Sequence, residues 1–499
     1  MSEVSTRGAM LHPHPWRVFA ATSIGVIAVF VAMSGLTVAL PTLSRELDAT
    51  PTQTTWILLG YMVVTTALIL VFGRLADIVG RRPLYLSGLI VFTLASALCI
   101  VSQSAEFLIV ARILQGVGAA AVVTNNTALL TDTFPPHLLS QALGWNATVA
   151  ALGQIIGPVV GGAATALIGW RGLFVAVLGI ALIATVSSLL VIPRSVGRIR
   201  SREPFDLGGA LLATTLLTVV VLALTPGPGS AAWLPWSYAA VGVIVAVVLV
   251  VVQRRRAHPL IDLTLFADRG ISLVLLAGLL TATATYAVAL IISLYVQAVD
   301  GTSPFVAGLL VTPVAAGTVI AASAAGWLVT RIAPRTLAAS GMVLNTAGVL
   351  GVALVLSADG SLPVTALFLF LIGTGIGLFM TPSTSVLMLT VPAQRRGIAN
   401  GMRSTLQNVG NLLSTAIVVA IVPIGLGAAA QQAAYGGSPA AFDAAELNRF
   451  VDNLQLAGVV LGALSAVGIV VCLSFPRHQM PTPQETAPVP EYATTKESA

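Results

Sequence analysis

Charged residues are scarce in this sequence. Asp, Glu, Lys and Arg together make up 8% of its 499 residues, whereas soluble globular proteins carry about 25%. Hydrophobic residues make up 57%. The composition therefore excludes an ordinary soluble domain and predicts an integral membrane protein.

The sequence also has few groups that could carry acid–base or metal chemistry. Its two cysteines, Cys99 and Cys472, both fall inside long apolar runs, so neither a disulfide nor a metal site is expected. The five histidines lie between those runs, at positions 12, 14, 137, 258 and 478. All 18 Asp and Glu residues lie between the runs or at their ends, and no Gly-x-x-x-x-Gly-Lys-[Ser/Thr] loop occurs. We therefore expect no cofactor, no ATP and no membrane-embedded enzyme.

Long apolar runs dominate the chain instead. Most of them approach the ~20 residues that cross a bilayer as a helix. They cover about residues 17–40, 55–73, 84–101, 107–131, 142–168, 172–192, 207–226, 237–252, 271–296, 304–329, 336–357, 363–388, 400–425 and 454–475. These runs predict an all-α integral membrane protein with 14 transmembrane helices.

The basic residues are distributed unevenly around these runs. With a cytoplasmic N-terminus, only Arg45, Arg171 and Arg449 lie outside, and Arg112 and Arg403 lie within spans. The remaining 19 of the 24 Lys and Arg residues then face the cytoplasm, as the positive-inside rule requires. The net charge of +6 therefore reflects topology and not a nucleic-acid surface. The same asymmetry places both termini in the cytoplasm. Arginine outnumbers lysine 23 to 1, which suggests a bacterial source, so we expect a protein of the bacterial inner (cytoplasmic) membrane.

The motif Gly-Arg-Leu-Ala-Asp-Ile-Val-Gly-Arg-Arg at residues 73–82 forms a charged turn between two apolar runs. Its arginines are in reach of anionic head groups, and its acid can pair with them or cap a helix N-terminus. The string resembles the signature loop between spans two and three of the major facilitator superfamily of transporters. The resemblance implies a conformational latch, made by Gly73, Arg74, Asp77, Gly80, Arg81 and Arg82.

The chain contains a weak internal repeat. Residues 326–335 are similar to residues 73–82, and each segment follows the second span of its half. A parallel six-plus-six repeat with two inserted spans predicts this spacing, and the fold is then the major-facilitator fold of two six-helix bundles plus two inserted helices. The expected division is a cytoplasmic N-terminus (1–16), a first six-helix bundle (17–192), a linker with two inserted, lipid-facing helices (193–270), a second six-helix bundle (271–475) and a disordered cytoplasmic tail (476–499). Within the linker, residues 259–266 are expected to lie as an amphipathic segment on the inner surface.

Span five carries a run of small residues, Gly153-Gln-Ile-Ile-Gly157-Pro158-Val-Val-Gly161-Gly162. Glycines at i, i+4 and i+8 form a helix face that a neighbouring helix can approach closely. A proline breaks one backbone hydrogen bond and permits a kink. Ordinary helix packing is one interpretation of the run. The full string also resembles the antiporter signature found in exporters of the superfamily, which implies export.

Arg112 lies about five residues into span four. An arginine at the bilayer centre costs at least ~2.5–3.5 kcal/mol when it faces lipid, so we expect it to face a watery cavity or a polar partner. Snorkelling to the nearby interface is the alternative. The segment Arg112-Ile-Leu-Gln115-Gly116 matches a superfamily motif whose arginine is implicated in proton transfer. This match implies that Arg112 takes part in proton coupling.

Nearly the whole chain is similar to the fourteen-span drug:proton antiporters of the EmrB/QacA type. The similar segments include Ser34-Gly-Leu-Thr37-Val-Ala-Leu-Pro41, Gly169-Trp170-Arg171 and Arg396-Gly397-Ile-Ala-Asn-Gly401. That family usually has an aspartate in span one where this sequence has Ala32. The nearest other acids for proton coupling are Asp77 and Asp132. Each has a structural alternative as a helix cap or ion-pair partner, which we favour for Asp132.

Polar side chains at membrane depth are the candidates for a substrate pocket. They are Asn125, Asn126, Gln154, Tyr286, Gln297, Arg403, Gln407 and Asn411. Three of them, Arg403, Gln407 and Asn411, are spaced i, i+4 and i+8 and therefore share one helix face. Polar contacts between helices are the alternative role for each candidate.

Together these features predict a secondary active transporter that exports small lipophilic or amphipathic compounds, as in multidrug efflux, by proton antiport and alternating access. The expected partners are a small-molecule substrate, protons and the lipid bilayer, and we expect the monomer to be functional. An importer or exporter of a specific metabolite on the same fold, and a non-enzymatic membrane scaffold or receptor, are the alternatives. Since the only charges within spans are Arg112 and Arg403, neutral, zwitterionic or weakly acidic substrates are expected over lipophilic dications.

Overall fold

The structure is a computed structural model that describes residues 15–193, 206–225, 231, 233–256, 263–329, 331–356, 361–391, 396–437 and 442–475. Among these residues, 14 helical segments are long and apolar enough to cross a membrane. The predicted all-α fold with 14 spans is therefore confirmed. The expected N-terminal segment up to residue 14, most of the loop before residue 206 and the tail from residue 476 lie outside the described residues.

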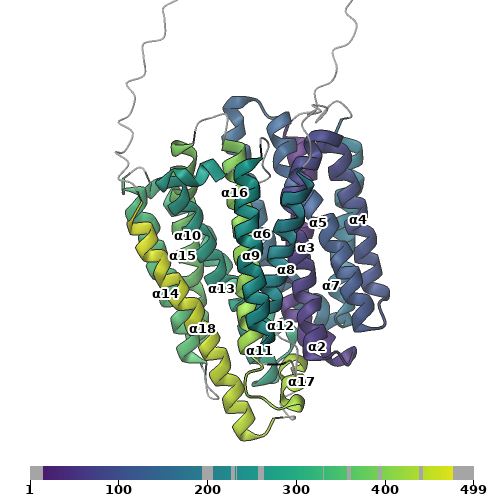
Figure 1. Ribbon diagram of the computed structural model, residues 1–499. Coiled ribbons are helices and arrows are strands. Elements are labelled where there is room, and N and C mark those ends of the chain that lie inside the picture. The colour runs from purple at the N-terminus through teal and green to yellow at the C-terminus, as the bar shows by residue number, and fades with distance from the viewer. Residues whose placement is uncertain are drawn as a thin grey trace, which may run out of the picture.

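The first part of the chain forms one helical bundle, drawn purple to blue in Figure 1. Its helices are α1 (Pro15–Ser34), α2 (Leu36–Glu46), α3 (Pro51–Val79), α4 (Arg81–Val101), α5 (Ala105–Thr133), α6 (Pro136–Ile168) and α7 (Arg171–Val191). α3 begins at a capping box, in which Thr50 and Gln53 satisfy each other's backbone N–H groups. α1 is the first membrane-spanning helix, and α2 follows it directly after Gly35.

The last part of the chain forms a second bundle, drawn green to yellow. Its helices are α10 (Arg269–Thr285), α11 (Val288–Ala298), α12 (Pro304–Leu310), α13 (Thr312–Leu328), α14 (Pro334–Val355), α15 (Leu362–Thr390), α16 (Arg396–Ile421), α17 (Ala428–Gly436) and α18 (Ala444–Leu473). α10 with α11, and α12 with α13, each make one span. The face of the molecule at which α1 begins and α18 ends is called the termini face below.

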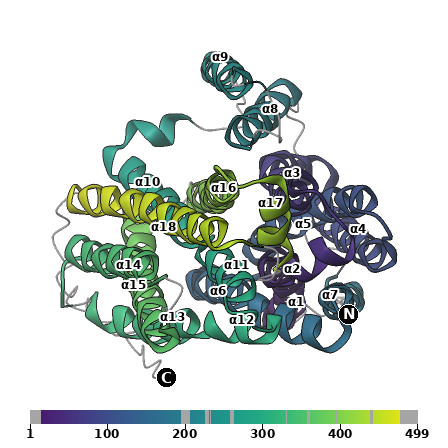
Figure 2. The ribbon, with the colours of Figure 1, turned by 90° about the horizontal axis from the view of Figure 1, so that it is seen from below.

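Two helices between the bundles, α8 (Leu207–Leu224) and α9 (Leu234–Arg255), stand apart from the rest in Figure 2. α8 packs against α9, α3 and α16. The large apolar side chains of Val243, Ile244 and Val247 on α9 are exposed, as expected for a helix that faces lipid. Of the predicted amphipathic segment, residues 259–262 lie outside the described part, and Leu263–Ala267 form a short 3-10 helix beside α10.

The turn at residues 73–82 is shorter than the sequence predicts. α3 continues through Val79, and the chain turns at Gly80. The φ angle of Gly80 is 106°, a value that glycine adopts readily because it has no Cβ atom. α4 starts at the next residue, Arg81. The apolar run ends near Gly73, but arginine, leucine and alanine are good helix formers, so the helix extends beyond the apolar layer. The end of hydrophobicity therefore marks where α3 leaves the membrane and not where it stops.

A break in the helix accompanies the first span of each bundle. Gly35 separates α1 from α2, and Tyr286 and Ala287 separate α10 from α11. At the second break, the Ala287 N–H donates to Ser414 Oγ on α16 at 2.9 Å. Interrupted spans mark substrate sites in many transporters because they bring backbone and polar groups to the protein interior.

Candidate functional site: a central cavity

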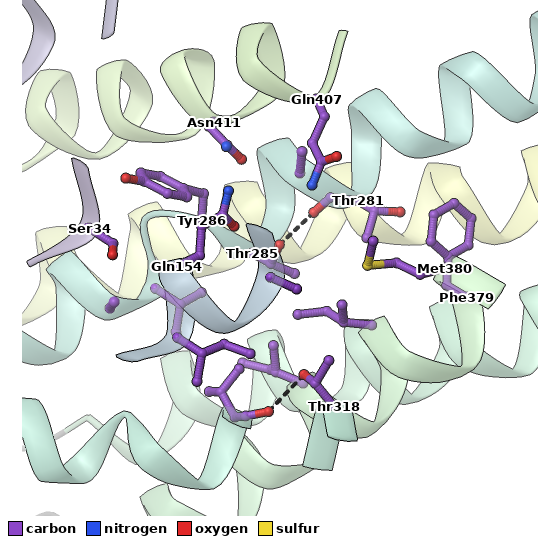
Figure 3. Close-up of a pocket in the computed structure, with 18 of the residues that line it drawn as sticks. Ser34, Gln154, Thr281, Thr285, Tyr286, Thr318, Phe379, Met380, Gln407 and Asn411 are labelled. Atoms are coloured by element: carbon purple, nitrogen blue, oxygen red, sulfur yellow. Dashed lines mark hydrogen bonds between the residues drawn. The ribbon is translucent and has the colours of Figure 1, made fainter. Parts of the chain in front are cut away.

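A cavity lies between the two bundles. Both helix breaks reach it, since Ser34 and Tyr286 form part of its wall. Much of the remaining wall is apolar and comes from α15, which contributes Leu369, Ile372 and Phe379. Five predicted pocket residues line it, namely Gln154, Tyr286, Arg403, Gln407 and Asn411. Figure 3 shows Tyr286, Gln154 and Asn411 near one end of the view, with Phe379 and Met380 at the other.

A second cavity adjoins the first. The two share Gln154, Arg403, Gln407 and Asn411. Asn126 joins the wall of the second cavity, where its Nδ2 donates to Asn146 Oδ1. The other wall residues come mainly from the parts of α1, α3, α5, α6 and α16 that lie toward the termini face. The combined cavity therefore extends from the bundle centre toward that face.

Two predicted pocket residues lie elsewhere. Asn125 is fully buried in α5, and its Nδ2 donates to Ala121 O at 2.8 Å, so its amide returns to its own helix. Gln297 donates to Val38 O at 3.1 Å and to Ser293 Oγ at 2.8 Å. Neither residue is part of the described walls of these cavities. Both side chains make polar contacts within or between helices, which is the alternative role given in the sequence analysis.

Several wall residues were not predicted from the sequence. They are mainly hydroxyl and apolar residues: Ser34, Thr281, Thr285, Thr318, Ser383, Phe379 and Met380. Threonine and serine are common in membrane helices because their hydroxyls can bond the preceding turn. A sequence signal exists for Ser34, which lies beside Gly35, a residue that tolerates a helix break; nothing in the sequence marks the break beside Thr285.

The predicted glycine face of α6 packs on the break in the first span. A Cβ atom at Gly153 would lie 3.0 Å from Phe30 Cβ. At Gly157 it would overlap Ser34 Oγ and lie 3.0 Å from the Gly35 nitrogen. At Gly161 it would overlap the Gly35 carbonyl. Glycine at these three positions therefore allows α6 to approach the broken span backbone to backbone.

The other side of the same run contacts the second bundle. A Cβ atom at Gly162 would overlap the Pro304 carbonyl of α12, and one at Gly308 of α12 would overlap the Pro158 carbonyl of α6. Pro158 also lines the central cavity. α6 therefore holds together the first span, the cavity wall and the contact between the bundles.

Arg112 is fully buried in the first bundle. Its Nη1 donates to Ala32 O at 3.2 Å and to Gln115 Oε1 at 2.6 Å, and its Nε donates to Ile57 O at 3.3 Å. Its guanidinium carbon lies 4.1 Å from the centre of the Tyr61 ring. The Arg112 side chain therefore does not snorkel to the interface; it bonds polar partners inside the bundle, as expected. The Ala32 position contributes a carbonyl oxygen where a side-chain carboxylate was expected from the resemblance.

The arginines of the predicted latch tie helices together at the termini face. Arg81 pairs with the Asp132 carboxylate and donates to Ala128 O at 3.2 Å. Arg82 Nε donates to Ile192 O, just beyond α7, at 2.8 Å. The ion pair agrees with the structural alternative for Asp132. The side chain of Asp77 lies outside the described residues, so the latch stays a prediction.

The face opposite the termini is closed by contacts between the bundles, where α2 meets α11 and α17 at the lower end of Figure 1. Three hydrogen bonds, called the seal below, cross it: Gln297 Nε2 to Val38 O (3.1 Å), Arg45 Nη1 to Gly436 O (3.3 Å) and Gln432 Nε2 to Asp48 Oδ1 (2.9 Å). The cavity is thus sealed on one side and extends toward the other.

Weakening the seal is expected to open the cavity to the opposite face. The double variant Arg45→Ala/Gln432→Ala removes two partly exposed hydrogen bonds, each worth about 0.5–1.5 kcal/mol, so the open population rises roughly tenfold. The measurement is the labelling rate of a cysteine at Thr285 in the cavity wall by a membrane-impermeant maleimide added to the face of α17.

Arg449→Ala is the matched control for this experiment. Arg449 lies at the same face, but its bond to Gly425 O at 2.7 Å stays within the second bundle. Its loss is expected to leave labelling unchanged. Equal labelling in the double variant and this control would contradict the assignment of the seal.

Two helical bundles around a cavity that reaches one face of a membrane-spanning molecule define a secondary transporter. The family model of the Major Facilitator Superfamily matches residues 22–415. The chain belongs to this superfamily, and it is a non-enzymatic, multi-pass membrane transporter.

Among curated relatives, the chain is similar to the multidrug resistance protein Stp of Mycobacterium tuberculosis, with 32% identity over 82% of this chain and 76% of Stp. The tetracenomycin C resistance and export protein of Streptomyces glaucescens is 28% identical over 83% and 77%. The riboflavin transporter RibZ of Clostridioides difficile is 29% identical over 80% and 87%. A solved bacterial homologue of the human lysosomal transporter Spinster shares the fold, with a TM-score of 0.65 at 14% identity over 93% of this chain and 97% of that one.

Proposed function

We propose that the protein exports small lipophilic or amphipathic compounds from a bacterial cytoplasm by proton antiport. The observation that carries the proposal is the largely apolar cavity between the bundles, sealed at one face and extended toward the other. Apolar walls with a few polar groups suit ligands that partition into membranes. The names of Stp and of the tetracenomycin C exporter point in the same direction.

The arginine distribution supports a cytoplasmic termini face. Arg254 and Arg255 at the end of α9, and Arg269 at the start of α10, lie on that side, as the positive-inside rule requires. In this orientation the described conformation is open toward the cytoplasm and ready to load a compound. Release then requires the seal to part while the termini face closes.

The α6 contacts support alternating access by rocking. α6 touches the first span on one side and α12 on the other through close backbone approach at its glycines, so its contacts allow the bundles to pivot with little side-chain interlocking. Proton coupling is assigned to the Arg112 network and to the Asp77 region. The cavity is complete within one chain, which supports a functional monomer.

Transport of one particular metabolite is the second candidate, favoured by the similarity to RibZ. A compound panel separates the two. In an efflux-deficient bacterial host, expression of the protein is expected to lower the accumulation of several unrelated lipophilic compounds. Lowered accumulation of a single compound would favour the metabolite transporter, and raised accumulation would contradict export.

A further inference from the structure

We infer that the central cavity recognises amphipathic compounds carrying one negative charge, such as a carboxylate or sulfonate. The anion-binding group is the Arg403–Gln407–Asn411 stripe of α16, together with the hydroxyls of Tyr286 and Ser383. This inference rests on the proposed function, because it names the substrate class of the same cavity.

The charge of the cavity is the first support. Arg403 lines both the central and the adjoining cavity. Among the described wall residues of the two cavities there is no aspartate or glutamate. The Arg403 guanidinium carries a fixed positive charge and five N–H donors, so an anionic group in the cavity gains from it and a cationic group does not.

The hydrogen-bonding groups of the wall are the second support. Most of its hydroxyls are already used within their own helices. The bonds are Ser34 Oγ to Phe30 O (2.8 Å), Thr281 Oγ1 to Ala277 O (2.7 Å), Thr285 Oγ1 to Thr281 O (2.8 Å), Thr318 Oγ1 to Val314 O (2.8 Å) and Thr384 Oγ1 to Met380 O (2.8 Å).

Three wall groups are different. Tyr286 Oη, Ser383 Oγ and Asn411 Nδ2 are buried and have no hydrogen-bond partner among the described residues. Asn411 is 2% exposed and Ser383 is 4% exposed. Buried polar atoms are almost always satisfied, and all three of these groups can donate a hydrogen bond. Asn411 Nδ2 can only donate, and the two hydroxyls can donate or accept, so an anionic oxygen can satisfy all three groups.

The apolar part of the wall accounts for the rest of the ligand. Leu369, Ile372, Ile376, Phe379 and Met380 all come from α15, and Figure 3 shows Phe379 and Met380 away from Tyr286 and Asn411. An apolar body against these side chains, with its anionic group among Arg403, Asn411, Tyr286 and Ser383, buries both parts of an amphipathic molecule.

Three ligands with one ring system test the inference: pyrene-1-carboxylate, pyrene-1-carboxamide and 1-pyrenylmethylammonium. They are titrated by fluorescence against the purified full chain in phosphatidylcholine nanodiscs. We expect the carboxylate to bind at least roughly tenfold more tightly than the ammonium, as a charge-assisted hydrogen bond implies. Because binding is measured without transport, a failure here and a failure of export are separate results.

Two variants locate the anion site. Arg403→Gln is expected to weaken the carboxylate roughly tenfold and the carboxamide less than about threefold, whereas Arg403→Lys keeps most of the carboxylate affinity. Comparison within one lipid cancels partitioning into the membrane. Equal affinity for the three ligands, or a uniform loss in Arg403→Gln while Arg403→Lys binds normally, overturns the inference.

A lipid head group presents the same chemistry as a free anion. Repeating the titration with one-fifth phosphatidylglycerol separates these sources. Competition that depends on Arg403 assigns the site to an anionic lipid, and unchanged binding assigns it to a free amphipathic anion; both outcomes support anion recognition.

Discussion

Replacing Gly157 by leucine is expected to abolish transport while the protein still inserts into the membrane. A Cβ atom at this position would overlap Ser34 Oγ and lie 3.0 Å from the Gly35 nitrogen. A leucine must therefore push α6 away from the broken first span, at a cost of roughly 1–3 kcal/mol or more. This shift also displaces Pro158 and Ser34 from the cavity wall. Transport should fall at least about a hundredfold, since small misplacements of a site are costly.

Gly179→Leu is the matched control for this variant. Gly179 lies in α7, and a Cβ atom at this position would have no neighbouring atom within 4 Å, so a side chain there meets open space. Both variants are compared for membrane abundance, melting temperature and transport. Normal transport by Gly157→Leu at wild-type abundance would show that the glycine face is not a working interface, and the exporter assignment would weaken with it.

Replacing Arg112 by leucine is expected to remove coupled transport but to leave ligand binding nearly intact. The change removes the hydrogen bonds from the guanidinium to Ala32 O, Ile57 O and Gln115 Oε1, and a hydrogen bond to a charged group is worth about 1.5–3 kcal/mol. The first bundle should therefore melt at a lower temperature. Arg112 is not among the described wall residues of the central cavity, so affinity for a cavity ligand should change less than about threefold.

Arg171→Leu separates coupling from stability. Arg171 also donates to two carbonyl groups, Ile100 O at 3.1 Å and Ser102 O at 2.8 Å, and stacks 4.2 Å from the Trp170 ring. It lies at the end of a span, away from the cavity. We expect its replacement to lower stability while gradient-driven transport persists. If the two arginine variants lose transport in proportion to their loss of stability, Arg112 has no special part in coupling.

The large features of this molecule could be predicted because membrane physics imposes them. A span needs about 20 apolar residues, so all 14 were visible in the sequence. A charge inside a span needs a partner, which is why Arg112 and Arg403 stood out. The helix break between α1 and α2 lies at Gly35, and glycine tolerates such a break. Nothing in the sequence around Tyr286 and Ala287 marks the break between α10 and α11.

The residues of the cavity wall were harder to predict, because the direction in which each side chain points from its helix decides whether it reaches the cavity. Asn125 and Asn126 are neighbours, yet successive residues of a helix point about 100° apart. The first bonds its own helix at Ala121 O, and the second lines a cavity. α17 was also missed, since nine alanine-rich residues in a loop carry no membrane signal. Its place in the seal depends on contacts with α2 that only the fold creates.

Transport by inside-out membrane vesicles under an imposed pH gradient tests the central claim most directly. The vesicles are acidified inside and offered a neutral lipophile or a quaternary dication of similar size. Proton antiport through a cavity with Arg403 and no described carboxylate predicts that the neutral compound accumulates, that a protonophore collapses this accumulation, and that Gly157→Leu vesicles show none. Accumulation that ignores the gradient, or that strongly favours the dication, would contradict the account.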